Sequence, residues 1–252
     1  MYMRFVHLNV KPEAMNNLRP LYEQQIVPVL RQRPGCLFAG LVQGVAHANE
    51  CISMTLWDSP QHAEAYERSG VFAKLLRDIQ PFLADSSEWK IHLAQDLTVQ
   101  YELVPEEPVV KAYHVSTHKP ENILPSTNSG GMYVRIVSPQ LREGKVEEFR
   151  RIYNTEMLPR LRAVKGCRYA AIIEHVTEPE KLISISIWNS KQDADDYEVS
   201  GVFDELTEKV KHTFSEIYQW KMQLEQETGK PVTTSAEMTV EGYSIVAGQS
   251  FL

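Results

Sequence analysis

The chain opens with the sequence MYMRFV at residues 1–6, and the closely related sequence MYVRIV stands at residues 132–137. The spacing of 131 residues then continues without a gap, so that residues 1–93 and 132–224 share 29 identities in 93 positions. A register kept over this length predicts two copies of one folding unit. Function is therefore sought in what two such units build together.

The length agrees with this duplication, because 252 residues suit two domains of about 130 residues each. We predict a first module with a C-terminal extension strand over 1–116 and a second module with its own extension strand over 132–252. The segment 117–131 between them contains Lys119-Pro120 and a run of small polar residues, which is typical of a flexible linker.

Composition and charge exclude several classes of partner. The chain is 43% hydrophobic and 23% charged, with a formal net charge of −7 and no run of Lys or Arg, which argues against binding to nucleic acid or anionic lipid. No apolar stretch approaches the ~18 residues of a membrane span, and no signal region is recognised at the N-terminus. We expect a cytoplasmic protein, with Cys36, Cys51 and Cys167 as reduced structural thiols.

Local patterns in each copy predict the order β-α-β-β-α-β. Alternating or β-branched runs indicate strands, apolar residues at helical spacing indicate helices, and Pro28 and Pro159 should loosen the last turns of the first helix. In the first copy the expected elements are a strand over 2–10, a helix over 13–32, strands over 36–45 and 50–57, helices after Ser59 and Ser69, and a last strand over 89–93. The second copy repeats them, with strands over 167–176 and 181–188 and a last strand over 220–224.

The predicted fold class is α+β, with two ferredoxin-like βαββαβ modules forming an intramolecular pseudo-dimeric α+β barrel. Helices cover one face of each antiparallel sheet, and the other face must be buried somewhere. The second module is the obvious cover. After each module a similar β-like segment follows, 108–115 and 238–246, which we interpret as extra or exchanged strands that clasp the neighbouring module.

Two motifs in each copy resemble a known family. Residues 28–36 read Pro-x-Leu-Arg-x-x-x-Gly-Cys, and residues 57–72 read Trp-x-Ser-x-x-x-Ala-x-x-Tyr-x-x-Ser-x-x-Phe. The pattern is similar to the antibiotic biosynthesis monooxygenase domains of the dimeric α+β barrel superfamily. The resemblance covers about three quarters of the chain. It implies the fold, and an activity among cofactor-independent oxygenases of polycyclic phenols, haem-degrading oxygenases or isomerases of small phosphorylated sugars.

The resemblance does not extend to the haem-degrading residues. Leu76 and Thr207 stand where that branch has its axial histidine, and Val6 and Val137 stand where it has an asparagine. We therefore expect no cofactor and no metal site. No nucleotide, phosphate, serine-hydrolase or zinc-protease motif is present in the sequence.

Aromatic residues shared by the copies are the first candidates for a ligand site. Trp57 and Trp188 could stack on a flat aromatic substrate, or fill the space between sheet and helices. Tyr66 and Tyr197 could orient an enol or phenolate by hydrogen bonding as catalytic residues, or pack at a helix end with the hydroxyl in water.

Charged and titratable residues supply the other candidates. Arg4 and Arg135 recur within the first strand of each copy, where a buried charge needs either an acidic partner or the anionic group of a ligand. His7 and His92 have no histidine counterpart in the second copy. If a histidine serves as the catalytic base, only one of the two pockets has it.

The leading hypothesis is a cofactor-independent monooxygenase that acts on a small flat aromatic of the phenol or quinol type. The alternatives are a non-catalytic module that binds a small ligand or haem, and a structural or assembly protein with a filled barrel. The expected partner is a small apolar or aromatic ligand, with no nucleic acid and no membrane. Further association of the pseudo-dimers into a homo-oligomer is left open.

Overall fold

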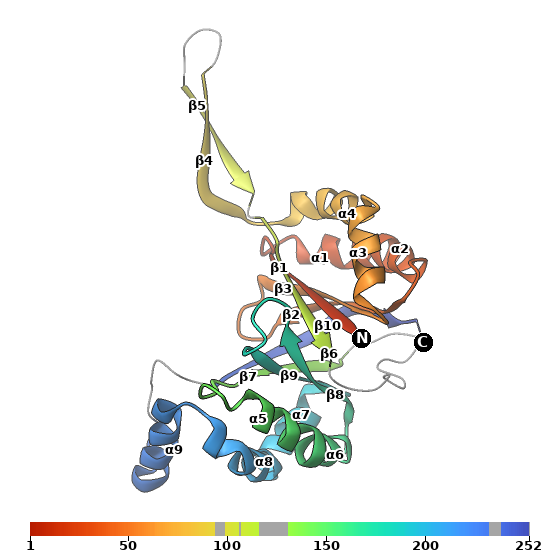
Figure 1. Ribbon diagram of the computed structural model, residues 1–252. Coiled ribbons are helices and arrows are strands. Elements are labelled where there is room, and N and C mark those ends of the chain that lie inside the picture. The colour runs from red at the N-terminus through yellow and green to blue at the C-terminus, as the bar shows by residue number, and fades with distance from the viewer. Residues whose placement is uncertain (94–98, 106, 116–130, 232–237, 252) are drawn as a thin grey trace.

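The computed structural model describes residues 1–93, 99–105, 107–115, 131–231 and 238–251, with side chains for all of these except 86–93 and 99–105. A closed barrel of eight strands lies at the centre, in the order β1-β3-β2-β10-β7-β9-β8-β6. The helices of the two modules cover opposite sides of this barrel (Figure 1). The predicted pseudo-dimeric α+β barrel is therefore confirmed.

The two modules contain corresponding elements. The first consists of β1 (Tyr2–Asn9), α1 (Met15–Leu21), the π-helical turn η1 (Tyr22–Ile26), α2 (Val27–Arg31), β2 (Cys36–Gly44), β3 (Glu50–Trp57), α3 (Pro60–Arg68), α4 (Val71–Ile79) and the 3-10 turn η2 (Gln80–Phe82). The second consists of β7 (Tyr133–Ser138), α5 (Val146–Ile152), the π-helical turn η3 (Tyr153–Met157), α6 (Leu158–Arg162), β8 (Cys167–His175), β9 (Leu182–Trp188), α7 (Lys191–Val199), α8 (Val202–Val210), the 3-10 turn η4 (Lys211–Thr213) and α9 (Glu216–Thr228).

Two further strands close the barrel. β6 (Val109–Val115) pairs with β1 of its own module and with β8 of the other, and β10 (Thr239–Ser250) pairs with β7 and with β2. Each therefore completes one sheet and joins it to the next. The segments that the sequence marks as clasping strands are these two strands, and they leave neither sheet with a free edge inside the barrel.

The barrel interior is packed with side chains from both modules. Inward-facing residues of every barrel strand form one apolar cluster, which includes Met3, Phe5, Met54, Tyr113, Ile136, Ile185, Tyr243 and Ile245. Each sheet alone would expose this face to water. Burial of apolar area between the modules therefore provides the main driving force for their association.

Local sequence signals explain the helix boundaries. The hydroxyls of Ser59 and Ser190 accept the backbone N–H groups of His62 and Asp193, as expected for N-cap residues. The first helix is irregular just before Pro28, which cannot donate a backbone hydrogen bond: the N–H of Val27 reaches the carbonyl of Tyr22 in the π-helical turn, and Val27–Arg31 continue as α-helix.

The predicted strand over 220–224 is wrong, because these residues lie within helix α9. The Ser215 hydroxyl accepts the N–H of Tyr218 at the start of the helix, and Gly229 ends it in the left-handed conformation. The sheet edge that such a strand would join is already occupied by β10. Trp220 is consequently 57% exposed.

The equivalent segment of the first module is a strand, β4 (Asp85–Leu93), but it does not join the barrel. It pairs with β5 (Val99–Pro105) in a separate two-stranded sheet. The fourth strand of each module is therefore the later extension strand. The predicted linker lies outside the described residues, apart from Gly131.

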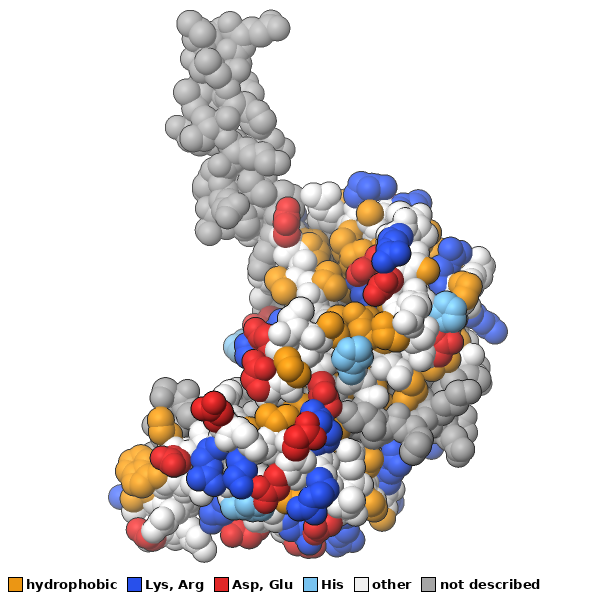
Figure 2. All heavy atoms as spheres, viewed as in Figure 1, with side chains coloured by type: hydrophobic (Ala, Val, Ile, Leu, Met, Phe, Trp, Pro, Cys, Tyr) orange, Lys and Arg blue, Asp and Glu red, His pale blue; other side chains and the backbone are white. Residues whose placement is uncertain are grey.

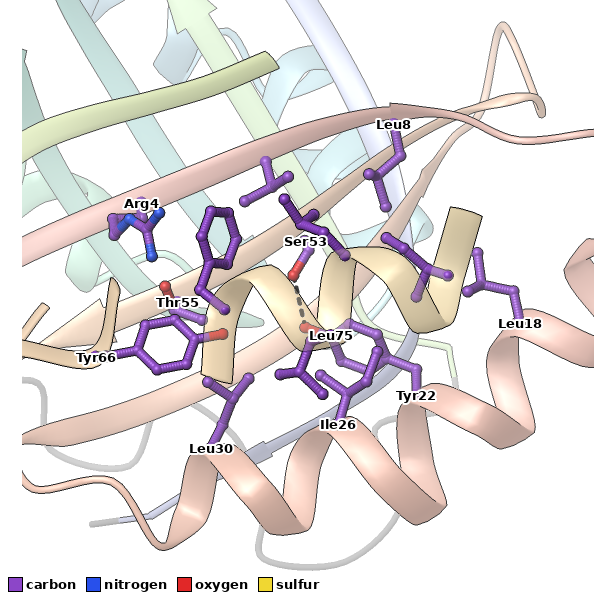
Figure 3. A pocket seen from close by; sticks show the side chains of 14 residues that line it. Arg4, Leu8, Leu18, Tyr22, Ile26, Leu30, Ser53, Thr55, Tyr66 and Leu75 are labelled. Carbon is purple, nitrogen blue, oxygen red and sulfur yellow. Dashed lines mark hydrogen bonds between the residues drawn. The ribbon is translucent and has the colours of Figure 1, made fainter. Parts of the chain in front are cut away.

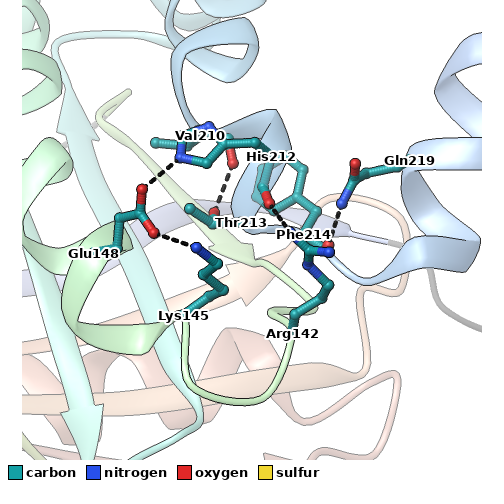
Figure 4. Close-up of polar contacts among 8 residues, drawn as sticks. All are labelled: Arg142, Lys145, Glu148, Val210, His212, Thr213, Phe214 and Gln219. Atoms are coloured by element: carbon teal, nitrogen blue, oxygen red, sulfur yellow. Dashed lines mark hydrogen bonds and ion pairs between the residues drawn. The ribbon is translucent and has the colours of Figure 1, made fainter.

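A cluster of polar contacts connects α5 to the end of α8. Glu148 of α5 accepts hydrogen bonds from Lys145 at 2.6 Å and from His212 of η4 at 2.9 Å (Figure 4). Arg142 donates to the His212 carbonyl at 2.8 Å, and Gln219 of α9 donates to the Phe214 carbonyl at 2.7 Å. These contacts hold η4 against α5 and fix the start of α9 within the second module.

On the face shown in Figure 2, acidic and basic side chains are interspersed over the helices of the second module. Among the described residues, none of the helices has both the length and the apolar character required to cross a membrane.

Because β6 and β10 each pair with both modules, we expect the barrel to unfold in one cooperative transition. Ile245→Ala removes a side chain buried in the shared core and should lower the free energy of unfolding by about 2–5 kcal/mol. Urea unfolding followed by both fluorescence and circular dichroism checks this. Trp220→Ala is the matched surface control, with an expected change of roughly 0.5 kcal/mol or less. Two separate transitions in the wild type would contradict this coupling.

The Glu148 cluster predicts a pH dependence. Hydrogen bonds from Lys145 and then His212 lower the pKa of Glu148 to about 2, so its stabilising contribution is present above the ordinary pKa near 4.5 and is lost as the pH falls toward 2. Glu148→Gln should lower the urea midpoint at about pH 6, and the difference from wild type should shrink at about pH 2.5. The exposed Glu13→Gln is the control. A difference that does not change with pH would contradict the assignment.

Candidate functional site

The alternation of β1 separates two faces of the first sheet. Met3 and Phe5 point into the barrel, whereas Arg4, Val6 and Leu8 point toward the helices. Between this outer face and the helices lies a cavity. Its location places it within a single module, away from the packed barrel interior.

The cavity of the first module has mostly apolar walls. Side chains from β1, β3 and five helical segments surround it: Arg4, Val6, Leu8, Leu18, Tyr22, Ile26, Leu30, Ser53, Thr55, Tyr66, Phe72, Leu75, Leu76 and Ile79 (Figure 3). Inside these walls, about 40 Å³ accepts the centre of a water molecule. A few waters therefore fit, and a bicyclic ligand requires the covering helix α4 to move outward.

The second module has an equivalent cavity, in which about 40 Å³ accepts the centre of a water molecule. Nearly every wall position corresponds to one in the first cavity at the spacing of 131 residues, including Arg135, Tyr153, Ser184 and Tyr197. One difference is a hydroxyl: Thr207 stands in the second wall where Leu76 stands in the first. Gene duplication has thus produced two related sites with slightly different walls.

A buried arginine is the charged group in each cavity wall. The Arg4 side chain is 3% exposed, and its guanidinium carbon lies 4.5 Å from the ring centre of Phe72 and 5.8 Å from that of Tyr66. Its Nη2 forms an ion pair with Glu67, whose side chain is 43% exposed. The guanidinium therefore lies between a carboxylate at the surface and the cavity.

The second arginine repeats this geometry. Arg135 Nε and Nη2 contact one carboxylate oxygen of Glu198 at 2.8 Å and 2.7 Å, and the guanidinium carbon lies 4.4 Å from the ring centre of Phe203. The sequence left open whether these arginines pair with an acid or with a ligand. In both modules the acidic partner is present, on the helix that precedes α4 or α8.

Tyr66 and Tyr197 lie in the cavity walls, and the tryptophans lie behind them. Trp57 stacks on Tyr66 with ring centres 5.2 Å apart and donates its indole N–H to Thr55; Trp188 does the same with Tyr197 and Ser186. Both indoles are fully buried, and neither belongs to the lining of its cavity. The tryptophans therefore fix the tyrosine rings from behind.

The tyrosine hydroxyls are in their neutral form. Burial is the largest influence on Tyr66 and Tyr197 and raises the pKa of each phenol above its ordinary value, although the nearby arginines act in the opposite direction. Figure 3 shows the Tyr66 hydroxyl directed toward the middle of the cavity. Within the described part of the chain, neither hydroxyl has a hydrogen-bond partner, so each can donate to a ligand.

A second tyrosine in each wall is paired with a serine. Tyr22 and Ser53 are joined by a hydrogen bond of 2.9 Å, and Tyr153 and Ser184 by one of 2.8 Å. Both tyrosines are fully buried. Their hydroxyls nevertheless place a polar pair in the floor of each cavity.

His7 is not part of either cavity. It follows Met3 and Phe5 on the inward side of β1 and opens into a different pocket at one end of the barrel, with Asn9, Glu50 and Tyr243. Burial and then the Lys111 charge lower the pKa of His7 to about 4, so it is neutral at physiological pH. The side chain of His92 lies outside the described residues.

The three cysteines are free thiols. Burial raises the pKa of Cys36 and Cys51 to about 12 and that of Cys167 to about 11. Thiols with such pKa values carry little thiolate at neutral pH and are poor nucleophiles.

The wall residues do not fit haem ligated by histidine. The described lining of both cavities contains no histidine, and Leu76 and Thr207 occupy the positions where the haem-degrading branch has one. The described residues likewise contain no group of three or more His, Cys, Asp or Glu side chains that could hold a metal ion.

Sequence reasoning missed the glutamates. Glu67 and Glu198 are identical in the two copies, and this identity beside the tyrosines was the available signal. They were missed because they occupy a helix face that reads as solvent-exposed. Only the packing of α3 against β1, and of α7 against β7, brings them to the arginines.

Comparison with known protein families gives a match in each module. The family described as antibiotic biosynthesis monooxygenase matches residues 1–77 and 132–209, more than half of the chain. Both segments contain the arginine, the tyrosine pair and the covering helices described above. None of the curated proteins compared with the chain matches it.

Solved structures share the fold at low sequence identity. A candidate monooxygenase from Fusobacterium nucleatum is 7% identical with a TM-score of 0.69, covering 99% of this chain and 94% of that one. A candidate monooxygenase from Lactobacillus acidophilus is 8% identical with a TM-score of 0.64, with coverage of 99% and 96%. An anthrone oxidase-like protein is 12% identical with a TM-score of 0.56, with coverage of 99% and 92%.

The Tyr22–Ser53 hydrogen bond predicts a measurable coupling. Tyr22→Phe and Ser53→Ala each leave one hydroxyl unpaired in the cavity floor and should cost about 1–3 kcal/mol, whereas the double variant should cost clearly less than their sum. Urea unfolding of the four proteins measures the coupling. Tyr153→Phe and Ser184→Ala provide the corresponding cycle in the second module, where the coupling should be smaller because the Tyr153 hydroxyl also donates to the Ala171 carbonyl at 3.3 Å. Additive effects in both cycles would show that these hydrogen bonds contribute nothing to stability.

Proposed function

The chain belongs to the antibiotic biosynthesis monooxygenase family, and from this premise we propose that it is a cofactor-independent monooxygenase acting on small flat aromatics of the phenol or quinol type. The observation that carries the proposal is the duplicated cavity. Each copy has apolar walls with a few convergent polar groups, the arrangement expected for a small aromatic ligand.

The overall reaction needs no external reductant. When a phenol with a hydrogen on the reacting carbon takes up O₂, one oxygen atom becomes the new quinone carbonyl. The other leaves as water, with the two hydrogens lost from the substrate. The protein would supply a dry pocket and fix the orientation of the ring, while the electron-rich substrate itself reacts with oxygen.

The tyrosines are assigned an orienting role. Because Tyr66 and Tyr197 are neutral, each would donate its O–H to the oxygen of the substrate and would not remove a proton. Trp57 and Trp188 would hold the tyrosine rings by stacking, so they would act as positioning residues without touching the substrate.

The assignments of His7 and His92 remain candidates without support from the geometry of the cavities. His7 faces another pocket, as described above, and no lining residue of either cavity among those described is a histidine. An alternative function, ligand binding without catalysis, is favoured by the same apolar walls. It would give binding without oxygen consumption.

Oxygen uptake tests the proposal. With hydroxynaphthalenes and hydroquinones as substrates, the wild type should consume oxygen, and the double variant Leu76→Phe with Thr207→Phe should lose roughly tenfold to hundredfold in rate because the added rings fill both cavities. Each single variant should lose only the activity of its own cavity. An oxygen electrode and product absorbance provide the readouts.

Trp220→Ala is the control, since this exposed residue lies on α9 outside both cavities. The cavity variants overpack their surroundings and should lose about 1–3 kcal/mol, so their folding is checked by thermal denaturation. Ligand binding without oxygen uptake by the wild type would support the alternative. Uptake that is unaffected in the folded double variant would exclude these cavities as the active sites.

A further inference from the structure

Each cavity contains one positive charge and no negative charge of its own. Among the described lining residues, the charged side chains are Arg4 in the first cavity and Arg135 in the second, and none is a carboxylate. A buried guanidinium is costly unless it is paired, and the described walls supply no carboxylate on the cavity side. The charge on the cavity side therefore points to an anionic ligand.

The carboxylate that compensates each arginine approaches from the surface. The side chains of Glu67 and Glu198 are 43% and 45% exposed, whereas those of the arginines are 3% and 5% exposed. Glu67 contacts Nη2 of Arg4, and Glu198 contacts Nε and Nη2 of Arg135. A guanidinium has five N–H donors, so these contacts leave some unused.

Unused donors remain in both modules. Within the described residues, no hydrogen bond from Nη1 of Arg4 or of Arg135 is found, and Nη2 of Arg4, which lies against Glu67, is buried without a hydrogen bond of good geometry. Figure 3 places Arg4 at the wall of the cavity, with Tyr66 and Thr55 beside it. A ligand oxygen held there could accept from the guanidinium and from the Tyr66 hydroxyl together.

The remaining walls limit the ligand to one charge. Apart from the arginine, the polar groups of the first cavity are hydroxyls, and the Tyr22 and Ser53 hydroxyls already satisfy each other. A phosphate or dicarboxylate would bring charge that nothing in the wall can neutralise. A flat ring with a single acidic oxygen matches one guanidinium surrounded by apolar surface.

We infer that each cavity binds its aromatic ligand as a phenolate or enolate monoanion, held by Arg4 or Arg135, with Glu67 and Glu198 as the counter-ions that the ligand competes against. This deepens the proposed function, because it names the ionisation state of the substrate. In this inference the guanidinium of Arg4 or Arg135 activates the substrate by stabilising its anion, since the described walls offer no carboxylate or imidazole as a base.

Other titratable groups lie near each arginine and tyrosine, and their charges also influence how binding depends on pH. Around the first arginine they are Tyr2, Arg33, Cys36, Glu64, Tyr66 and Glu67. Around the second they are Tyr133, Cys167, Lys191, Asp195, Tyr197, Glu198 and Asp204.

The test uses 4-nitrophenol, whose phenolate absorbs visible light and whose neutral form does not. Titrated with excess protein across a pH series, the bound probe should ionise at lower pH than the free probe. Nitrobenzene, with the same ring and no acidic oxygen, is the matched control ligand. Absorbance reports ionisation directly, without any dependence on turnover.

Two sets of variants should move the result in opposite directions. Arg4→Met with Arg135→Met keeps an apolar stem beside Phe72 and Phe203, and should weaken binding of the phenolate roughly tenfold to hundredfold while leaving nitrobenzene binding unchanged. The double variant Glu67→Gln with Glu198→Gln leaves each buried arginine without its carboxylate, so its folding is checked by thermal denaturation. It should strengthen phenolate binding and lower the pH of ionisation further.

The inference is overturned if the bound probe keeps the spectrum of the neutral phenol, or if the folded arginine variant binds the phenolate as tightly as wild type. Its failure is distinct from failure of the proposed function. If the protein consumes oxygen but binds the probe in its neutral form, the proposed monooxygenase activity stands and binding of the ligand as an anion is excluded. If the protein binds the phenolate tightly but consumes no oxygen with any phenol, the anion-binding site stands and the monooxygenase activity is excluded.

Discussion

The structure depends on one constraint: each four-stranded sheet has an apolar face that its own helices do not cover. The two modules bury these faces against each other, and β6 and β10 turn this contact into a closed barrel because each pairs with strands of both modules. A barrel has no free edges, so neither sheet is exposed to further pairing at this point. Covalent linkage of the two copies also removes the entropic cost of bringing two separate chains together.

Because side chains fill the barrel interior, both candidate sites lie outside it. The two candidate cavities lie on the outer sheet faces, beneath the helices of each module. The same strands therefore serve two purposes: their inward residues hold the modules together, and the outward residues of β1, β3, β7 and β9 line the cavities. Changes in the cavity walls can accumulate with little effect on the shared core, and Leu76 against Thr207 is one such change.

Duplication has preserved the sites more faithfully than the periphery. The arginine, its glutamate, both tyrosines and the stacked tryptophan recur at the same positions, with ring and ion-pair geometries that agree closely. By contrast, the segments after the fourth helix of each module have diverged. Trp89 lies in strand β4, whereas Trp220, its counterpart with the same following lysine, lies in helix α9.

The sequence by itself determined the duplication, the order of most strands and helices, and the fold class, because alternation, helical spacing and serine caps are local signals that each copy repeats. It also singled out Arg4, Tyr66 and Trp57. Only the tertiary structure decided which strand completes each sheet, that residues 220–224 form a helix, and that Glu67 faces Arg4 while Trp57 lies behind Tyr66. Those outcomes depend on competition for sheet edges and on packing between segments distant in sequence, which no local pattern encodes.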